Sequence, residues 1–175
     1  GNGPSLKKQD LSLIRNEFSF GVNNMVVSDQ FKAVDPNFYV LIDSNYFELE
    51  SVLAENLEKL TRMKSPPICV FPARKRQYSE EKGLDMRLEI IYVAYYVERI
   101  KSYKDISLTK YVPFSLNVVN VALFTAIYMG FKKIYLLGVD MTNIIHTYDR
   151  DRKVDDGGHL YDKNQKLENF YQKKF

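Results

Sequence analysis

The sequence predicts an α/β fold in which a mostly parallel sheet is flanked by helices, and three observations support it. Continuous apolar runs at 38–42, 68–71 and 134–139 have the composition of strands buried on both faces. Apolar residues at 46–62 and 114–129 recur at helical spacing, and these stretches alternate with the runs. Alternating helices and strands are typical of parallel βα units, so we predict a Rossmann-like domain.

Shorter segments fill in the order of elements in the first part of the chain. We expect a short helix or turn at 11–14, and the polar–apolar alternation of 17–22 indicates a strand that ends at Asn23-Asn24. The run 38–42 ends at Asp43-Ser44-Asn45, which is suited to cap the helix that follows.

The later part of the chain is less regular. Residues 72–87 show no clear pattern, and 88–97 could form a strand or a buried helix, of which we favour the strand. Gly130 stands in a helix-terminating position. The segment 142–158 is polar and irregular, and 160–170 resumes a helical pattern. Since no repeat or second domain is visible, the whole chain is expected to form one domain, residues 1–175.

The chain opens on the turn Gly1-Asn2-Gly3-Pro4-Ser5. A glycine-rich turn normally follows a hydrophobic strand, so we expect that the first strand of the fold is missing and that the sequence is a fragment. The glycines let the backbone approach a ligand closely, and N–H groups there favour an anion such as phosphate. The turn matches neither the dinucleotide fingerprint nor the P-loop, because it lacks their third glycine and their Lys-Ser/Thr pair.

Composition excludes several classes of protein. The net charge of +3 over 175 residues is too small to indicate a nucleic-acid partner. No apolar stretch is long enough to span a bilayer, and no signal peptide is visible. Cys69 is the single cysteine, which rules out an internal disulfide, and its place in the run 68–71 suits a buried side chain in a reducing compartment. We therefore expect a cytoplasmic protein.

Polar residues follow several predicted strands, and in parallel sheets ligands bind beyond the carboxyl ends of the strands. We expect these residues to converge on one edge of the sheet, next to an irregular loop that carries two histidines and a tyrosine. They are Asn2, Asn23, Asp43 and Asp140 at the edge, and His146, Tyr148 and His159 in the loop.

Two strings in the sequence carry a family resemblance. GNGPSLKKQDLSLI at the N-terminus and GFKKIYLLGVD more than a hundred residues later resemble bacterial sialyltransferases that use CMP-activated sialic acid. They are also similar to uncharacterised polysaccharide-locus proteins and to archaeal hydroxymethylpterin diphosphokinase-like domains. The first string is fairly specific to this group, whereas the second is shared across its branches.

The resemblance implies a pocket for a nucleotide-sugar. Asn23 matches an Asn that touches the nucleotide-sugar in the sialyltransferases, and Asp43 stands where that family has another Asn. The resemblance also puts Asn2 and Ser5 in this pocket. With the glycines of the turn and the strand-end aspartate, the expected nucleotide-binding residues are Gly1, Asn2, Gly3, Ser5, Asn23, Asp43 and Asp140.

The resemblance also implies the catalytic residues. Tyr148 matches a tyrosine that steadies the leaving phosphate, and His159 is the nearest candidate for the general base. Two departures count against a true sialyltransferase. The Arg and Ser-Gly expected before the long helix are replaced by residues 115–118, and a second tyrosine is replaced by Thr142.

These features predict an inverting, metal-independent glycosyltransferase-like domain that needs no cofactor. Its partners would be a nucleotide-sugar donor and a glycan acceptor of surface polysaccharide assembly. One alternative is a Mg²⁺-dependent diphosphokinase-like enzyme, with Asp43 and Asp140 as metal ligands. Another is a non-catalytic module that binds nucleotide or a partner.

The remaining charged motifs are read as ordinary surface. Asp149-Arg150-Asp151 has the spacing of a metal-binding carboxylate pair, but we interpret it as a charged loop. One cysteine and two histidines cannot form a zinc cluster, so no metal site is predicted. The basic run Arg74-Lys75-Arg76 is interpreted as solvated. Its alternative is contact with an acidic acceptor or with the inner membrane, as a peripheral association.

Overall fold

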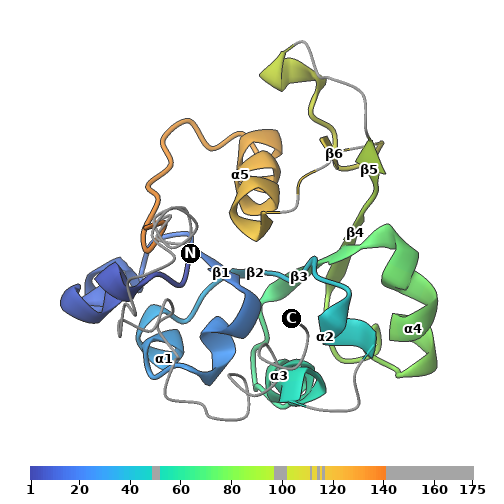
Figure 1. Ribbon diagram of the computed structural model, residues 1–175, viewed down its shortest axis with the longest axis horizontal. Helices are drawn as coiled ribbons and strands as arrows, with labels where there is room; N and C mark the ends of the chain where they lie inside the picture. The colour runs from blue at the N-terminus through green and yellow to red at the C-terminus, as the bar shows by residue number, and fades with distance from the viewer. Residues whose placement is uncertain (49–51, 97–101, 111, 114, 116, 141–175) are drawn as a thin grey trace, which may run out of the picture.

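The centre of the protein is a parallel sheet of four strands in the order β1-β2-β3-β4, as seen in a computed structural model (Figure 1). The strands are β1 (Phe20–Val22), β2 (Phe38–Val40), β3 (Ile68–Pro72) and β4 (Ile90–Val93). A smaller parallel pair joins β5 (Tyr95–Tyr96) to β6 (Val112–Pro113). The structure describes residues 1–48, 52–96, 102–110, 112–113, 115 and 117–140. The predicted α/β fold with a parallel sheet is confirmed.

Helices cover both faces of this sheet. In Figure 1, α5 lies on one face, and α1 to α4 lie on the opposite side. The α-helices are α1 (Gln30–Val34), α2 (Asn45–Glu48), α3 (Val52–Thr61), α4 (Arg76–Glu81) and α5 (Val118–Tyr128). The 3-10 helices are η1 (Pro4–Lys8), η2 (Leu11–Ile14), η3 (Asn23–Val27), η4 (Ala73–Lys75) and η5 (Tyr103–Asp105). None of the helices in the described part of the chain is long and apolar enough to cross a bilayer.

The alternation of side chains along the strands produces two cores. Val22, Val40 and Val70 are aligned across three strands and belong to the core that includes Val118 and Val121 of α5. The neighbouring aligned pair Tyr39 and Cys69 belongs to the core on the opposite face, with side chains from α1, α2 and α3. Because both faces are covered, β2 and β3 are apolar, as the sequence predicts for 38–42 and 68–71.

Most predicted elements are present, with shorter bounds. The predicted helix at 46–62 corresponds to α2 and α3, and residues 49–51 between them lie outside the described part. The favoured strand at 88–97 is confirmed as β4 and β5. Helix α5 begins after Asn117, whose side chain accepts a hydrogen bond from the Val119 N–H at 2.9 Å, and it ends before Gly130, which has φ +87°.

Two regions differ from the sequence prediction. The region 72–87, for which no regular element is predicted, contains η4 and α4. The predicted buried strand at 134–139 is wrong, because these residues form no strand in the structure. Ile134, Tyr135 and Leu136 are 37%, 73% and 56% exposed. No strand of the described residues pairs with this segment, so it lacks the ladder of hydrogen bonds that a buried strand requires.

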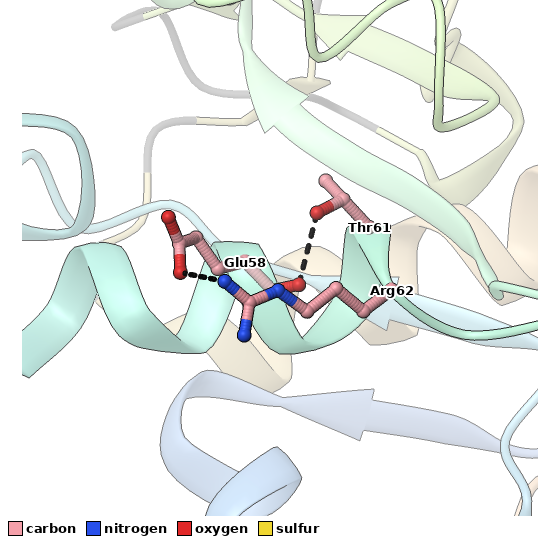
Figure 2. Close-up of polar contacts among 3 residues, drawn as sticks. All are labelled: Glu58, Thr61 and Arg62. Atoms are coloured by element: carbon pink, nitrogen blue, oxygen red, sulfur yellow. Dashed lines mark hydrogen bonds and ion pairs between the residues drawn. The ribbon is translucent and has the colours of Figure 1, made fainter.

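Helix α3 ends in an exposed polar arrangement, shown in Figure 2. Arg62 Nη2 lies 2.9 Å from Glu58 Oε2, and the Thr61 hydroxyl donates to the Glu58 carbonyl oxygen at 2.9 Å. The charged side chains are 77% and 61% exposed, so this pair contributes at most about 1 kcal/mol to stability.

Candidate functional site

The N-terminal turn packs against the segment that follows residue 136. The Gly1 nitrogen donates to the Leu137 carbonyl oxygen at 2.7 Å, and the Gly3 N–H donates to the Gly138 carbonyl oxygen at 2.8 Å. A Cβ on Gly3 would overlap the Asp140 carboxylate and lie 2.9 Å from the Gly138 oxygen. Gly3 is therefore required for a close approach within the protein itself.

Ser5 and Asp140 form the polar centre of this arrangement. The carboxylate of Asp140 accepts the Ser5 N–H at 2.7 Å on one oxygen and the Ser5 hydroxyl at 2.6 Å on the other. These bonds hold the pKa of Asp140 below its usual value, the hydroxyl making the largest contribution. The N–H groups of Gly3 and Ser5 both donate to acceptors within the protein. Neither is therefore available to bind the anion that the sequence predicts for this turn.

Asn2 connects the turn to the carboxyl end of β1. Its Nδ2 donates to the Val22 carbonyl oxygen at 2.9 Å, and the residue is 8% exposed. This bond fixes the amide orientation, so Oδ1 points the other way. That oxygen is buried and has no hydrogen-bond partner among the described residues. An unsatisfied buried acceptor is costly in a folded protein, which makes Asn2 a candidate ligand-binding group.

Asn23 follows β1 directly and has a left-handed backbone with φ +50°. Its carbonyl oxygen accepts the Tyr39 hydroxyl at 2.5 Å, and the same hydroxyl accepts the Val26 N–H at 2.8 Å. The Asn23 Oδ1 atom is also buried without a hydrogen-bond partner in the described part of the chain. Tyr39 therefore shapes the backbone that presents a second unsatisfied acceptor.

A buried amide network lies next to Asn23. The Oδ1 atom of Asn24 accepts both the Tyr46 hydroxyl at 2.7 Å and the Asn56 Nδ2 at 2.8 Å. Asn24 and Asn56 are 0% and 1% exposed. These bonds connect η3, the segment that follows β1, to α2 and α3 and so hold it in place.

Asp43 and Ser44 follow β2, and Arg74 follows β3. Asp43 is exposed, and the Arg74 Nη2 donates to the Ser44 hydroxyl at 2.6 Å. The next two basic residues lie over rings: Lys75 Nζ is 5.9 Å from the Phe47 ring centroid, and the Arg76 guanidinium is 4.4 Å from that of Tyr92. The three basic side chains thus each contact another residue, in addition to the contact with solvent that the sequence suggested.

The structure brings most of the predicted edge residues together. Asn2, Ser5 and Asp140 are joined through the turn, and Asn2 reaches the end of β1, where Asn23 begins η3. Asp43 lies beyond the next strand along the sheet. Sequence reasoning missed Tyr39, Asn56 and the contact between Arg74 and Ser44. A tyrosine inside an otherwise apolar run is a signal that could have found Tyr39, since a buried hydroxyl needs a partner.

The predicted catalytic residues Tyr148 and His159 lie outside the described residues, as do His146 and Asp149-Arg150-Asp151. The described residues contain no cluster of three or more His, Cys, Asp or Glu side chains that could hold a metal ion.

An apolar hollow of about 820 Å³ lies beside the turn. It extends between β1 and the segment 133–137, and several side chains around it are strongly exposed, including Leu13 at 80% and Phe18 at 70%. A nucleotide needs polar partners, which this lining provides poorly. We therefore take the polar groups at the strand ends as the candidate site, since ligands bind there in parallel α/β sheets.

Comparison of the chain with protein-family models, with curated proteins and with solved structures gave no match. The candidate site therefore stands on its own geometry, and the family resemblance of its motifs stays a prediction.

Proposed function

We propose that this domain binds a nucleotide-sugar at the carboxyl edge of its sheet and transfers the sugar to a glycan acceptor. The observation that carries this proposal is the pair of buried acceptors, Oδ1 of Asn2 and Oδ1 of Asn23, which have no hydrogen-bond partner among the described residues. Ribose hydroxyls and the exocyclic amine of a base are neutral donors that suit such acceptors. The position at the strand ends is where parallel α/β sheets bind ligands.

The reaction requires a base and a group that stabilises the leaving phosphate. In this proposal His159 removes the proton from the acceptor hydroxyl, a role that suits imidazole because free histidine titrates close to neutral pH. The acceptor oxygen then bonds to the anomeric carbon with inversion, while the bond from that carbon to the phosphate oxygen breaks. Tyr148 donates a hydrogen bond to the departing phosphate, so neither a metal ion nor a cofactor takes part. We place the activity in the cytoplasm, on acceptors presented at the inner membrane.

Ligand binding is tested by thermal shift of the full chain with CMP, CDP, UDP, GDP and ATP, each with and without Mg²⁺. A ligand at a hundred times its dissociation constant adds about 2.7 kcal/mol to stability, a readable shift. Stabilisation without metal is expected. Stabilisation by ATP with Mg²⁺ alone would instead indicate the diphosphokinase-like enzyme, and no stabilisation by any nucleotide would refute the proposal.

The contribution of the two amides is tested with Asn2→Ala and Asn23→Gly. Glycine keeps the left-handed backbone at Asn23 while removing its side chain. A matched control is Asp35→Gly, because Asp35 is the other non-glycine residue with positive φ in the described chain, at +49°, and it ends α1. Both asparagine variants are expected to lose the ligand shift, whereas Asp35→Gly retains it.

Catalysis is tested separately with His159→Ala. This variant is expected to abolish sugar transfer while leaving nucleotide binding intact. A domain that only binds nucleotide would show no transfer even in the unchanged protein, and EDTA would inhibit only a metal-dependent enzyme.

A further inference from the structure

Positive charge at the carboxyl edge of the sheet is concentrated after β3. Asn23 follows β1, Asp43 and Ser44 follow β2, and Tyr95 follows β4, whereas the segment after β3 carries Arg74 and Lys75. A nucleotide brings at least one phosphate to this edge. Since Gly3 and Ser5 use their N–H groups within the protein, the phosphate needs another partner.

Arg74 is positioned from the neighbouring strand end. Val40 of β2 is aligned with Val70 of β3, and Ser44 and Arg74 each stand four residues beyond that pair. The 2.6 Å bond from Arg74 Nη2 to the Ser44 hydroxyl is consistent with this alignment. The bond uses one of the five N–H donors of the guanidinium.

The next strand end contributes Tyr95. Pro72 is aligned with Val93, so Arg74 and Tyr95 both stand two residues beyond an aligned pair. Burial raises the pKa of Tyr95 to about 12, and the nearby charge of Arg74 opposes this shift. The Tyr95 hydroxyl therefore stays protonated at neutral pH. Arg74 is exposed and forms no ion pair with a carboxylate in the described part of the chain.

We propose that Arg74, held between the ends of β2 and β4 by Ser44 and beside Tyr95, binds the phosphate of the nucleotide. This inference rests on the proposed function and assigns one part of the ligand to one residue. Arginine suits the role because its planar fork of donors matches phosphate oxygens. β3 is two strands away from β1, a separation on the order of 10 Å that a nucleoside 5′-phosphate can span.

The arrangement separates two kinds of recognition. Asn2 and Asn23 offer neutral acceptors to the sugar or base, and Arg74 offers a cation to the phosphate. Removal of Arg74 should therefore weaken the binding of nucleotides and leave the binding of nucleosides unchanged. The exposed carboxylate of Asp43 precedes Ser44 and opposes an anion at this position, so its neutralisation should strengthen nucleotide binding.

The test measures dissociation constants of the full chain by titration calorimetry for CMP, UMP, GMP and AMP, each beside its own nucleoside. We expect the nucleotide to bind at least about tenfold more tightly than its nucleoside, as charged hydrogen bonds allow. In Arg74→Ala this ratio should fall towards one, in Arg74→Lys part of it should remain, and in Asp43→Asn it should increase.

The control is Arg62→Ala, which removes another exposed arginine, at the C-terminal end of α3 (Figure 2). It should leave the ratio unchanged. A ratio that is unchanged in Arg74→Ala, or an equal loss for nucleotide and nucleoside, would overturn the role of Arg74. If the unchanged protein binds nucleotides no better than nucleosides, Arg74 alone fails. If it binds neither, the proposed function fails as well.

Discussion

Ser5 donates both its backbone N–H and its hydroxyl to the carboxylate of Asp140, joining two residues that are 135 positions apart in the sequence. This contact holds the glycine-rich turn against the segment after α5. It also accounts for the demand for glycine at position 3, since any side chain there would meet the same carboxylate. The turn is thus a structural joint as well as a candidate part of the binding site.

The contact between Ser5 and Asp140 leads us to predict that Ser5→Ala lowers the stability of the protein. The substitution removes the 2.6 Å bond from the hydroxyl but keeps the 2.7 Å bond from the backbone. We expect the free energy of unfolding to fall by about 1.5 kcal/mol, the lower end of the range for a hydrogen bond to a charged group, because this bond is only partly buried. Chemical denaturation at pH 7 measures this, with Ser12→Ala as the control, since the Ser12 hydroxyl donates to the Asp10 carboxylate in an exposed turn. Equal losses in both variants would contradict the special role of Ser5.

The same contact predicts a dependence of stability on pH. The pKa of Asp140 is lowered from 3.8, chiefly by the Ser5 hydroxyl, so the ionised carboxylate is favoured in the folded protein. Its contribution is complete above the unfolded pKa and is lost as the pH falls through the folded pKa. The free energy of unfolding, measured by denaturation at several pH values below about 4, should therefore fall more steeply with decreasing pH in the unchanged protein than in Asp140→Asn. Identical pH profiles would show that Asp140 contributes no such linkage.

Tyr39→Phe should destabilise the loop after β1. The hydroxyl donates to the Asn23 carbonyl oxygen and accepts the Val26 N–H, and the side chain is 0% exposed. Phenylalanine keeps the ring but leaves these backbone groups without their partner, which should lower the free energy of unfolding by about 2 kcal/mol. Amide hydrogen exchange at Val26 should accelerate at the same time. Unchanged exchange there would mean that the hydroxyl does not hold this loop.

The strands were predictable wherever both faces of the sheet are covered. Val40 belongs to one core and Tyr39 to the other, so β2 is buried at every position. The run 134–139 has the same composition but forms no strand, because composition reports a preference for burial and cannot report whether a neighbouring strand is there to pair with. Helix α4 was not predicted because it has little apolar periodicity: Tyr78 and the buried Ser79 mark its inner side.

The candidate site was predictable only in outline. The order of strands and their parallel direction imply that Asn23 and Asp43 lie at one edge of the sheet, whereas Asn2 is placed there by its bond to the Val22 carbonyl oxygen. The particular contacts depend on tertiary packing, as in the bond from Arg74 to Ser44, whose residues are 30 positions apart. No spacing rule in the sequence reports such a pair.

Gly21→Ala should also destabilise the protein, because Gly21 is aligned with Tyr39 on the neighbouring strand. A Cβ on Gly21 would lie 2.7 Å from two atoms of the Tyr39 ring, so the ring must shift. We expect a loss of about 2 kcal/mol, as is typical of overpacking. In a Tyr39→Val background the additional loss should be smaller, since the ring atoms are gone. Two additive losses in this double-mutant cycle would show that the glycine is required for another reason.

Cys69 should be chemically inert in the folded protein. The side chain is 0% exposed, its thiol lies 3.5 Å from the Pro67 carbonyl oxygen, and burial raises its pKa to about 12. The reactive thiolate is therefore scarce at pH 8, and an alkylating reagent in solution has no access to the sulfur. We expect no reaction with iodoacetamide under native conditions and one equivalent of modification in denaturant, because Cys69 is the single cysteine. Leu13→Cys is the positive control: residue 13 is 80% exposed, so this variant should take up one equivalent without denaturant. Rapid native modification of the unchanged protein would show that β3 opens readily, and that the core beneath the candidate site is less protected than its packing implies.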